Sequence, residues 1–464
     1  MTEVVRDAVV VCVVYLVVVY GIGLVLAVLA FFVNHSRVRE GDAENWRTIT
    51  ESRFTIPVSV IAPMHNEEVI AVKAVEALLA LDYPELEVII VNDGSTDGTL
   101  VELERAFDLQ PFDRFERRVL PTREVFAVYR SRADERLTVV DKEAGGNKAD
   151  SLNCGINFAR YRYCCCVDGD TIYERDAILR SMRLVLRDPA TIVGLTSQIV
   201  VATHPELPYK STRGLIESTL LHCFQHIEYL RSFLNTRLAW SRLNSMLCTS
   251  GAFMLYRRDV LEEVGGFSPS FSCEDIELTF RVHERFLRTG RPYRILSMPE
   301  PVARTEGPDR IRSLTSQRAR WQRVMLETAW HYRRMAFNPR FGTFGMLALP
   351  YCILSEVLAP FVELLALVTL AAAAIGGAVD WTDYGLVVAV MSLAVATLSV
   401  AAIRLEDAGT RSYRFCDLVW LIVLSPLELV FYRPLLFWAH LRGAFGFCRG
   451  DKRWDRFERN LRTA

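Results

Sequence analysis

Two aspartates separated by one glycine are the first residues of the sequence that could bind a cation. Asp168-Gly169-Asp170 follows the apolar run Tyr163 to Val167, which has the composition of a buried strand. Mg²⁺ and Mn²⁺ prefer oxygen ligands, and in proteins they commonly combine one or two carboxylates with the phosphates of a substrate. The same triplet is also common in solvated turns, so its assignment to a metal site depends on the residues around it.

Polar residues also follow two other runs that have the composition of strands. Asn66 and Glu67 come after Val58 to Ile61, and Asp93 comes after Glu87 to Val91. A carboxylate or an amide at these positions can hydrogen-bond a ribose or a base edge, although Asp93 with the glycine after it is equally typical of a tight turn. Ligands of open α/β sheets gather outside the carboxyl ends of strands, so the shared position favours one nucleotide site.

The segment Lys142 to Lys148 could bind phosphate. It contains two glycines, which allow close approach of the backbone, and it leads into a predicted helix from Ala149 to Arg160. A helix N-terminus favours a phosphate, and Lys148 adds a positive charge. The glycine and lysine spacing differs from that of a Walker loop.

Glu274 and Asp275 begin another predicted helix and could supply a general base. Transfer of a sugar with inversion requires one carboxylate to take a proton from the attacking hydroxyl while a diphosphate leaves from the opposite face. We assign Asp275 as this base and Glu274 as the second choice. The alternative role of the pair is to stabilise the first turn of the helix through its dipole.

The pentapeptide Gln317-Arg318-Ala319-Arg320-Trp321 lies within a predicted helix from Ser313 to Met335. Spacings of three and four residues place Gln317 beside Arg320 and Trp321 on the helix surface. Arginine can bind a diphosphate through two hydrogen bonds, and an indole can stack on a sugar ring. The alternative is a basic helix that simply rests on lipid.

Histidines and cysteines give no second metal site in the sequence. His222 and His226 are four residues apart but lack the glutamate of a zinc-protease helix. The cysteines have no paired Cys-x-x-Cys spacing, and consecutive residues of the strand Cys164-Cys165-Cys166 point to opposite faces. The net charge of −1 gives no reason to expect a nucleic-acid partner.

Short β-rich runs alternate with helix-like segments between residues 55 and 300, which predicts a mostly parallel sheet covered by helices. Residues 108–136 carry many charges and two prolines without an apolar period, and we interpret them as a surface insertion. Residues 205–247 are mostly helical in character and could face the substrate or a membrane. Besides the three runs above, the predicted strands are Leu137 to Val140, Ile192 to Gln198 and Phe253 to Tyr256.

An uncharged apolar segment occupies residues 9–33. Its length of about 25 residues suffices to cross a bilayer core of about 30 Å. A cleaved signal peptide is the alternative, but its apolar region usually has only about 7–15 residues, so we expect a retained helix. His35, Arg37 and Arg39 follow closely, and the positive-inside tendency then places residues 34 onward in the cytosol.

Three further apolar stretches, at about residues 345–379, 385–403 and 415–441, are each long enough to span a membrane. Three crossings would leave the tail 442–464 outside, yet this tail has seven basic residues and three acidic ones. The charge pattern therefore predicts that part of 345–356, or the stretch around Pro426 and Pro434, lies in the interface.

The region 311–343 before these stretches is predicted to be amphipathic. Its helix carries many arginines, and its apolar side consists of Leu314, Trp321, Met325, Ala329 and Trp330. Such a helix suits the cytosolic surface of a membrane, and it would equally pack against the domain.

In this order, the motifs resemble those of glycosyltransferase family 2, in particular the processive membrane synthases of cellulose, hyaluronan and poly-N-acetylglucosamine. The resemblance covers about residues 55–335 and extends to the flanking apolar segments. The long segment 108–136, the single N-terminal span and Gln322-Arg323 after Trp321 differ from many relatives. The motifs that carry the resemblance are Pro63-x-x-Asn66-Glu67, Asp93-Gly94-Ser95, Gly145-Gly146-x-Lys148 with Asn153, Asp168-x-Asp170, Ser250-Gly251, Glu274-Asp275 and Gln317-x-x-Arg320-Trp321.

The resemblance implies a GT-A α/β domain at residues 55–310 that uses a UDP-sugar with Mg²⁺ or Mn²⁺ and extends a polysaccharide with inversion. It also implies a multi-pass protein of the plasma membrane with a cytosolic catalytic domain and polymer passage through the membrane part, and it is compatible with an accessory secretion protein. By position, the implied roles are donor binding for Asn66, Glu67, Asp93, Lys148, Asp168, Gln317 and Arg320, metal binding for Asp168 and Asp170, acceptor binding for Trp321, and base catalysis for Asp275 with Glu274 beside it.

Two other functions stay open at this point. The same donor site would serve a single transfer to a membrane lipid or a short acceptor. A transporter or scaffold that retains an inactive nucleotide-sugar fold is the second alternative, because a fold does not guarantee an activity.

Overall fold

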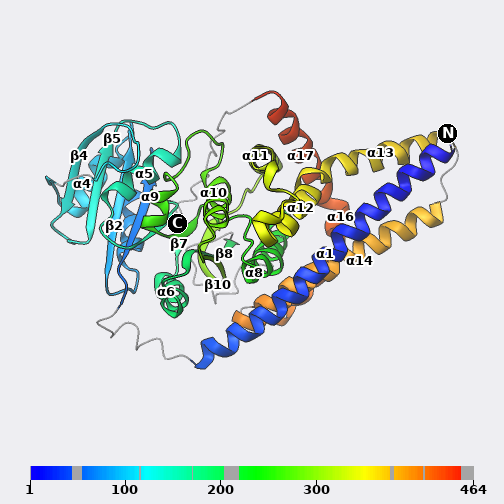
Figure 1. The fold of residues 1–464 in the computed structure, drawn as a ribbon, viewed down its shortest axis with the longest axis horizontal. Coiled ribbons are helices and arrows are strands. Elements are labelled where there is room, and N and C mark those ends of the chain that lie inside the picture. The colour runs from blue at the N-terminus through cyan, green and yellow to red at the C-terminus, as the bar shows by residue number, and fades with distance from the viewer. Residues whose placement is uncertain are drawn as a thin grey trace.

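The computed structural model describes residues 2–43, 55–113, 117–169, 171–202, 219–376, 381–410 and 413–450. Asp170 and most of the basic tail, residues 451–464, lie outside these ranges. An α/β domain forms one end of the molecule and a set of long helices forms the other (Figure 1).

The domain is built on one sheet of ten strands in the order β3-β4-β5-β2-β1-β6-β9-β8-β10-β7. Strands β5, β2, β1 and β6 pair in parallel, whereas β4, β9 and β7 run antiparallel to their neighbours, so the whole sheet is mixed. The strands are β1 Val58–Met64, β2 Leu86–Asp93, β3 Leu109–Pro111, β4 Val125–Ser131, β5 Leu137–Lys142, β6 Tyr163–Val167, β7 Ile172–Tyr173, β8 Ile192–Ala202, β9 Phe253–Arg257 and β10 Arg294–Glu306.

Side chains of the central strands alternate between two apolar cores, one on each face of the sheet. In β1, Val58, Val60 and Ala62 belong to the core on one face, and Ile61 belongs to the core on the other. All six strands predicted from the sequence are present. Because the central four are parallel, their carboxyl ends meet at one edge, where Asp93 and Lys142 end their strands.

Two parts of the sheet differ from the prediction. Residues 108–136, interpreted as a surface insertion, contain β3 and β4, which extend the sheet beyond β5. Strand β10 was not predicted, because Pro299 and Pro301 interrupt a run that otherwise has the composition of a strand, and proline cannot donate to a ladder. The pairing of β10 with β8 accordingly shifts register between Met298 and Ala303.

Helices cover both faces of the sheet and form the rest of the molecule (Figure 1). Those that matter for the site are α5 Lys148–Phe158, α7 Leu220–Leu230, the π-helix η1 Arg231–Arg237, α8 Leu238–Arg242, α10 Glu274–Thr289 and α11 Ile311–His331. The others in the described domain are α3 Ala71–Leu79, α4 Thr99–Phe107, α6 Ala177–Arg187 and α9 Arg258–Glu263.

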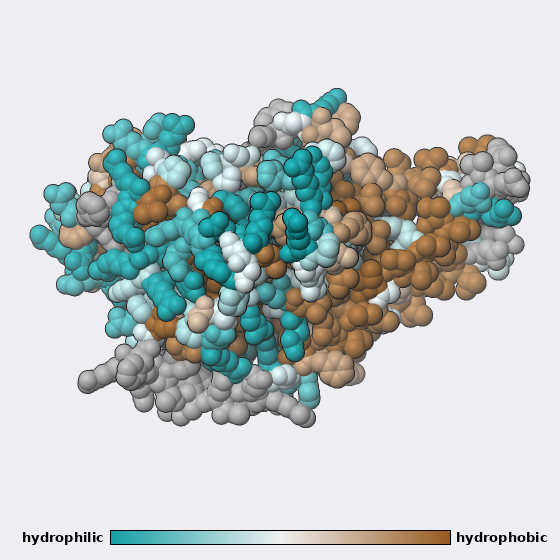
Figure 2. Space-filling model, viewed as in Figure 1, coloured by the Kyte–Doolittle hydropathy of each residue, from teal (hydrophilic) through white to brown (hydrophobic). Residues whose placement is uncertain are grey.

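Two helices of the described residues are long and apolar enough to cross a membrane, namely Arg6–Arg37 within α1 Thr2–Ala43 and Tyr384–Gly409 within α14 Trp381–Thr410. Two bent pairs, Phe344–Val357 with Ala359–Ile375 and Phe415–Phe431 with Arg433–Cys448, raise the number to four if each counts as one span. Helices α13 Ala359–Ile375 and α14 lie against α1. These helices carry an apolar surface that contrasts with the polar surface of the α/β domain (Figure 2).

The predicted amphipathic helix α11 is packed between other elements. Leu314 and Gln322 are buried, and so is Arg318, which the apolar pattern placed on the polar side. Trp330, predicted on the apolar side, is 62 % exposed. Helix α11 rests on α17 Arg433–Cys448, where a Cβ on Gly443 would lie 2.3 Å from the carbonyl oxygen of Ala319.

The helical segment after residue 218 packs against the long helices. Arg231 of η1 forms an ion pair with Glu428 and donates to Ser399 Oγ at 2.6 Å. Asn235 donates to the carbonyl of Leu398 at 2.8 Å. The sequence left open whether residues 205–247 face the substrate or a membrane. The described part, residues 219–247, packs against the long helices on one side.

Candidate active site

Asp93 ends β2 with its carboxylate held by a buried lysine. Lys142 Nζ lies 2.6 Å from Asp93 Oδ1 and 2.7 Å from Asp150 Oδ2, and its side chain has no exposed surface. The backbone N–H of Gly145 also donates to Asp93 Oδ1, at 2.9 Å. Burial alone would lower the pKa of Lys142, but the two carboxylates more than offset this effect and the pKa is raised. Lys142 therefore stays charged and fixes the orientation of Asp93.

Asn66 and Glu67 connect the loops that follow β1 and β2. Asn66 has a φ of 56°, in the left-handed region that asparagine tolerates better than most residues. Its Oδ1 accepts from the backbone N–H of Thr96 at 2.8 Å, and the N–H of Glu67 donates to Thr99 Oγ1 at 2.8 Å. The structure thus shows both residues shaping the loop next to Asp93.

Lys148 brings three predicted site residues together. Its ammonium lies 2.5 Å from Asp168 Oδ1 and 3.6 Å from Glu274 Oε1, and it donates to the carbonyl of Gly251 at 2.9 Å. Burial opposes the charge of Lys148, yet Asp168 and Glu274 raise its pKa overall. Burial raises the pKa of Glu274, and Lys148 counteracts this rise only in part. One lysine therefore joins the end of β6 to the start of α10.

Asp275 faces Gly251 across the same region. Its Oδ2 accepts from the backbone N–H of Gly251 at 2.8 Å. Its Oδ1 accepts from the N–H of Ile276 at 2.7 Å and from the thiol of Cys273 at 3.1 Å. A Cβ on Gly251 would lie 3.1 Å from Asp275 Oδ2, so a side chain there would crowd the carboxylate. These hydrogen bonds hold the carboxylate of Asp275 in one orientation.

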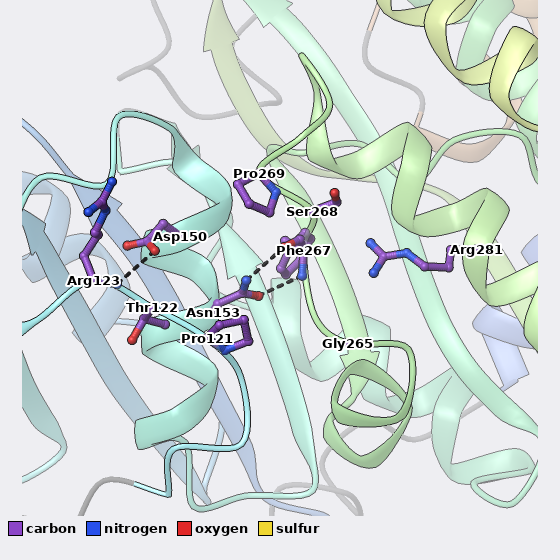
Figure 3. Close-up of a pocket in the computed structure, with 10 residues that line it drawn as sticks. All are labelled: Pro121, Thr122, Arg123, Asp150, Asn153, Gly265, Phe267, Ser268, Pro269 and Arg281. Carbon is purple, nitrogen blue, oxygen red and sulfur yellow. Dashed lines mark hydrogen bonds between the residues drawn. The ribbon is translucent and has the colours of Figure 1, made fainter.

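The loop before α10 is held on α5 by Asn153. The side chain of Asn153 donates to the carbonyl of Phe267 at 2.9 Å and accepts from its N–H at 2.7 Å. Figure 3 shows this pair of bonds beside an open pocket of about 330 Å³, which Arg123, Asp150 and Arg281 also line. The residues lining the pocket do not include Lys148, Asp168 or Asp275. The pocket is therefore separate from Lys148, Asp168 and Asp275, and Asn153 acts by placing the loop that leads to Glu274.

Arg318 contacts other side chains of the pentapeptide on α11 and a glutamate on α7. Only 1 % of it is exposed, and its guanidinium makes hydrogen bonds to both carboxylate oxygens of Glu228 on α7, the shortest at 2.7 Å. It also donates to Gln317 Oε1 and lies 4.0 Å from the centroid of the Trp321 ring. Tyr432 donates to the same Glu228 at 2.6 Å. The position of Trp321 is thus tied to α7 and to the bend before α17.

Asp168 is the described member of the predicted metal pair. Among the residues the structure describes, no group of three His, Cys, Asp or Glu side chains is placed to hold a metal ion. Divalent cations in phosphate-transfer sites need only one or two carboxylates, since phosphate oxygens complete the coordination. The carboxylate of Asp168 is 36 % exposed, and its hard oxygens fit Mg²⁺ or Mn²⁺ of this kind.

Four residues of the site escaped the sequence analysis as functional residues: Lys142, Glu228, Arg318 and Cys273. Lys142 was visible as the polar end of a strand, and Arg318 as a member of the pentapeptide. No signal in the sequence pointed to Glu228, because its partner Arg318 lies 90 positions away.

Two family models match the chain. The one described as glycosyl transferase family 2 matches residues 59–265, and the one described as glycosyl transferase family group 2 matches residues 163–432. The second covers more than half of the chain and reaches from β6 to the bend of the last helices.

Curated relatives include poly-beta-1,6-N-acetyl-D-glucosamine synthases. The enzyme of Staphylococcus epidermidis is 26 % identical over 277 residues, which cover 59 % of this chain and 56 % of the relative. The enzyme of Staphylococcus aureus (strain COL) is 26 % identical over 269 residues, covering 57 % and 53 %. The matched region thus spans only about half of each relative.

A solved structure shares the fold. It is the mannosyltransferase PcManGT from Pyrobaculum calidifontis in complex with GDP-Man and Mn²⁺, with a TM-score of 0.54 and 18 % identity. The alignment covers 93 % of this chain and 99 % of the mannosyltransferase. The likeness includes the helices that follow the α/β domain, and it assigns the domain to the GT-A fold.

Proposed function

The chain belongs to the family-2 glycosyltransferases, and we propose that it transfers a hexosyl group from a UDP-sugar, with inversion, to a growing β-linked polysaccharide at a membrane. The polysaccharide synthases among its relatives support the polymer as product. The observation that carries the proposal is the cluster around Lys148, where Asp168, Glu274 and the Gly251–Asp275 pair meet. The donor would bind on the side of Asp168 in this cluster, and the acceptor would bind on the side of Asp275.

Asp93 would bind the uridine of the donor. One of its oxygens is used by Lys142 and Gly145, and in the described part of the chain the other accepts no hydrogen bond. Asn66 and Glu67 would shape the adjoining loop, and Lys148, Gln317 and Arg320 would bind the diphosphate, as the family motifs imply. Charge-assisted hydrogen bonds of this kind are short and strong.

Asp168, with Asp170, would hold Mg²⁺ or Mn²⁺ against the diphosphate. When bound, the cation would offset the negative charge of the leaving group, which is its Lewis-acid role. The Mn²⁺ of the mannosyltransferase complex supports this choice of cofactor.

Asp275 would take the proton of the acceptor hydroxyl as that oxygen attacks the anomeric carbon. The hydrogen bonds from Gly251 and Ile276 hold the carboxylate in place, while a proton can still reach the face turned to the acceptor. The proton passes to Asp275, and the bond from the anomeric carbon to the diphosphate breaks on the opposite side. Glu274, whose pKa is raised by burial, would support the charge of Lys148.

The membrane part would consist of α1, α13 and α14 as crossing helices, with the last bent pair docked on α11. With this arrangement the tail would be on the same cytosolic side as the domain, as its basic composition favours. Polymer passage through these helices, with or without an accessory protein, belongs to the same proposal.

The experiment is product analysis with membranes that contain the chain. UDP-glucose, UDP-N-acetylglucosamine and UDP-glucuronate, labelled in the sugar, are offered separately and together. Labelled polymer that a specific glycosidase degrades is the expected result. A product that carries one sugar and extracts into organic solvent would overturn the polymer and establish the second candidate, a single transfer to a lipid.

The length of the match to the mannosyltransferase bears on the choice of donor. The mannosyltransferase matches over 99 % of its own length, whereas the polysaccharide synthases extend well beyond the matched region. GDP-mannose is therefore included among the donors tested. A scaffold without activity would release no nucleotide from any of them.

A further inference from the structure

A row of side chains on α7 and η1 connects Trp321 to the neighbourhood of Asp275. The ring centroids of Trp321 and Tyr229 lie 6.1 Å apart, and those of Tyr229 and Phe233 also lie 6.1 Å apart. The guanidinium of Arg237 lies 4.1 Å from the centroid of the Phe233 ring. The three residues are spaced by four along the helix, so they share one face.

The far end of this row lies beside the predicted base. Arg237 approaches the sulfur of Cys248 at 3.9 Å, and Cys248 is three residues before Gly251, whose N–H holds Asp275. Burial raises the pKa of the Cys248 thiol to about 12, with a further rise from Asp275 and a decrease from Arg237. The charges of Arg237 and Asp275 therefore both act on this thiol.

Arg237 has a donor group that nothing in the described chain uses. Its Nη1 is buried and makes no hydrogen bond. An unpaired buried donor costs about 1–3 kcal/mol, so a protein rarely keeps one without a partner at some stage of its action. Arg231, on the same π-helix, is by contrast fully engaged by Glu428 and Ser399.

The π-helical form of η1 is a second sign of function. Such segments are rare and often occur at functional sites. Here the segment Arg231–Arg237 directs Arg231 to the long helices and Arg237 to the domain. A regular α-helix has fewer residues per turn and would change the angle between the two arginines.

We propose that Arg237 binds the acceptor, donating from its guanidinium to a hydroxyl of its terminal sugar, while Tyr229 and Trp321 form an aromatic wall for the preceding sugar. This inference rests on the proposed function and adds a residue outside the family motifs. Hexose rings have apolar faces that suit aromatic side chains and hydroxyls at their edges that suit arginine. The row leads such an acceptor from α11 toward Asp275.

The buried Phe233 gives the row its rigidity. It is only 4 % exposed and contacts both Tyr229 and Arg237, so it is a positioning residue and is not expected to touch the sugar. The acceptor would meet Tyr229 and Arg237, which are both partly exposed.

The test compares Arg237→Met with Arg237→Lys and with the control Arg242→Met. Arg242 is an exposed arginine on the adjoining helix α8, so its variant loses the same charge away from the row. The full-length protein is studied in detergent with UDP-N-acetylglucosamine as donor and a β-1,6-linked N-acetylglucosamine pentasaccharide as acceptor. Binding of the pentasaccharide and of UDP is measured by calorimetry, and UDP release is measured in parallel.

We expect Arg237→Met to weaken pentasaccharide binding and to raise the acceptor KM about tenfold, the effect of one charge-assisted hydrogen bond. Affinity for UDP and the unfolding temperature should stay unchanged, Arg237→Lys should recover part of the binding, and Arg242→Met should resemble the wild type. An unchanged acceptor affinity in Arg237→Met, or a loss confined to UDP, would overturn the inference. A wild type that binds the pentasaccharide but never extends it would instead overturn the proposed function.

Discussion

The guanidinium carbon of Arg318 lies 4.0 Å from the centroid of the Trp321 ring, and the same group is bound by the carboxylate of Glu228. A cation over an indole face is attracted by the ring electrons. The orientation of Trp321 therefore depends on an ion pair between α11 and α7. Five predictions follow from the contacts of Arg318, the pairing of Lys142 with Asp93, the proposed base Asp275, the buried His283 and the exposed Cys448.

Arg318→Met should reduce polymer length and leave the affinity for UDP nearly unchanged, since Trp321 loses the cation that fixes it. Breaking a buried ion pair costs about 3–5 kcal/mol, so the double variant Arg318→Met/Glu228→Gln, which leaves no unpaired charge, should unfold at a higher temperature than the single one. Product length by gel filtration and near-ultraviolet circular dichroism of the tryptophans are the measurements.

The control for Arg318 is Arg333→Met. Arg333 lies 4.5 Å from the ring of Trp330, but both residues are exposed, so this variant removes a similar contact away from the site. Full-length polymer from the double variant would show that Trp321 does not need Arg318.

Lys142→Met should lower the free energy of unfolding by about 3 kcal/mol, because Asp93 and Asp150 both lose their buried counter-charge. It should also weaken UDP binding, since Asp93 is no longer held. Chemical denaturation and calorimetry with UDP measure the two effects, and Lys73→Met, an exposed lysine on α3, is the control. Normal UDP affinity in a folded Lys142→Met protein would contradict the proposed binding of uridine by Asp93.

Asp275→Asn should reduce transfer about a thousandfold, within the usual contribution of general-base catalysis. Asparagine retains the shape and can still accept from Gly251, so UDP affinity should remain close to that of the wild type. Its amide nitrogen would replace the oxygen that accepts from Ile276, so the free energy of unfolding should fall by about 1–3 kcal/mol. Single-turnover transfer measures the chemical step. Transfer at the wild-type rate would require another base, for which Glu274 is the neighbour to test.

The stability of the domain should fall in acid because of His283. Its Nε2 donates to the carbonyl of Met246 at 2.9 Å, its Nδ1 accepts from the hydroxyl of Tyr293 at 2.5 Å, and burial lowers its pKa to about 3. A lowered pKa means that the neutral ring is favoured in the folded state. The resulting stability is present above the pKa of the unfolded chain, about 6.5, and is lost as the pH falls toward 3.

The measurement is the unfolding temperature between about pH 8 and about pH 5, across the ordinary pKa of histidine. His283→Gln, which cannot titrate, should show a flatter pH profile together with a lower maximum. Identical profiles for the two proteins would assign the acid sensitivity to other groups.

Cys448 should react with a membrane-impermeant maleimide only from the side of the catalytic domain. It is one of two exposed cysteines among the described residues, the other being Cys416 in the apolar stretch. The variant Cys416→Ser retains Cys448 as the accessible thiol, and Cys448→Ser is the control for background. Labelling of intact cells, rather than of inverted vesicles alone, would place the tail outside.

The sequence predicts the central strands and their polar ends because alternation and strand-end chemistry are local properties. The four parallel strands β5, β2, β1 and β6 illustrate this, since each apolar run stops at a polar residue. Strand β10 could not be predicted in the same way. Its two prolines argue against a strand, and the long ladder with β8, formed by tertiary structure, compensates for the donors that they lack.

The residues of the site likewise fall into those with a local signal in the sequence and those that depend on tertiary contacts. Asp93, Asp168 and Asp275 have recognisable neighbours in the sequence, whereas the partners of Arg318 and Arg237 come from distant segments that only the fold brings together. The role of Lys142 depends on Asp150 in the following helix. The π-helix Arg231–Arg237 likewise has no local signal in the sequence, and the partners of Arg231 lie on distant segments of the chain.

Gly443 allows the last helix to touch the backbone of Ala319, in the middle of the motif that carries Trp321. Neither helix can slide or tilt there without moving the other. Helix α17 also packs on α13, one of the helices proposed to cross the membrane. A bilayer thicker or thinner than the apolar length of a crossing helix makes that helix tilt, a response known as hydrophobic mismatch. We therefore expect acyl-chain length to act on the acceptor end of the active site, so that the surrounding lipid tunes how readily this enzyme extends its product.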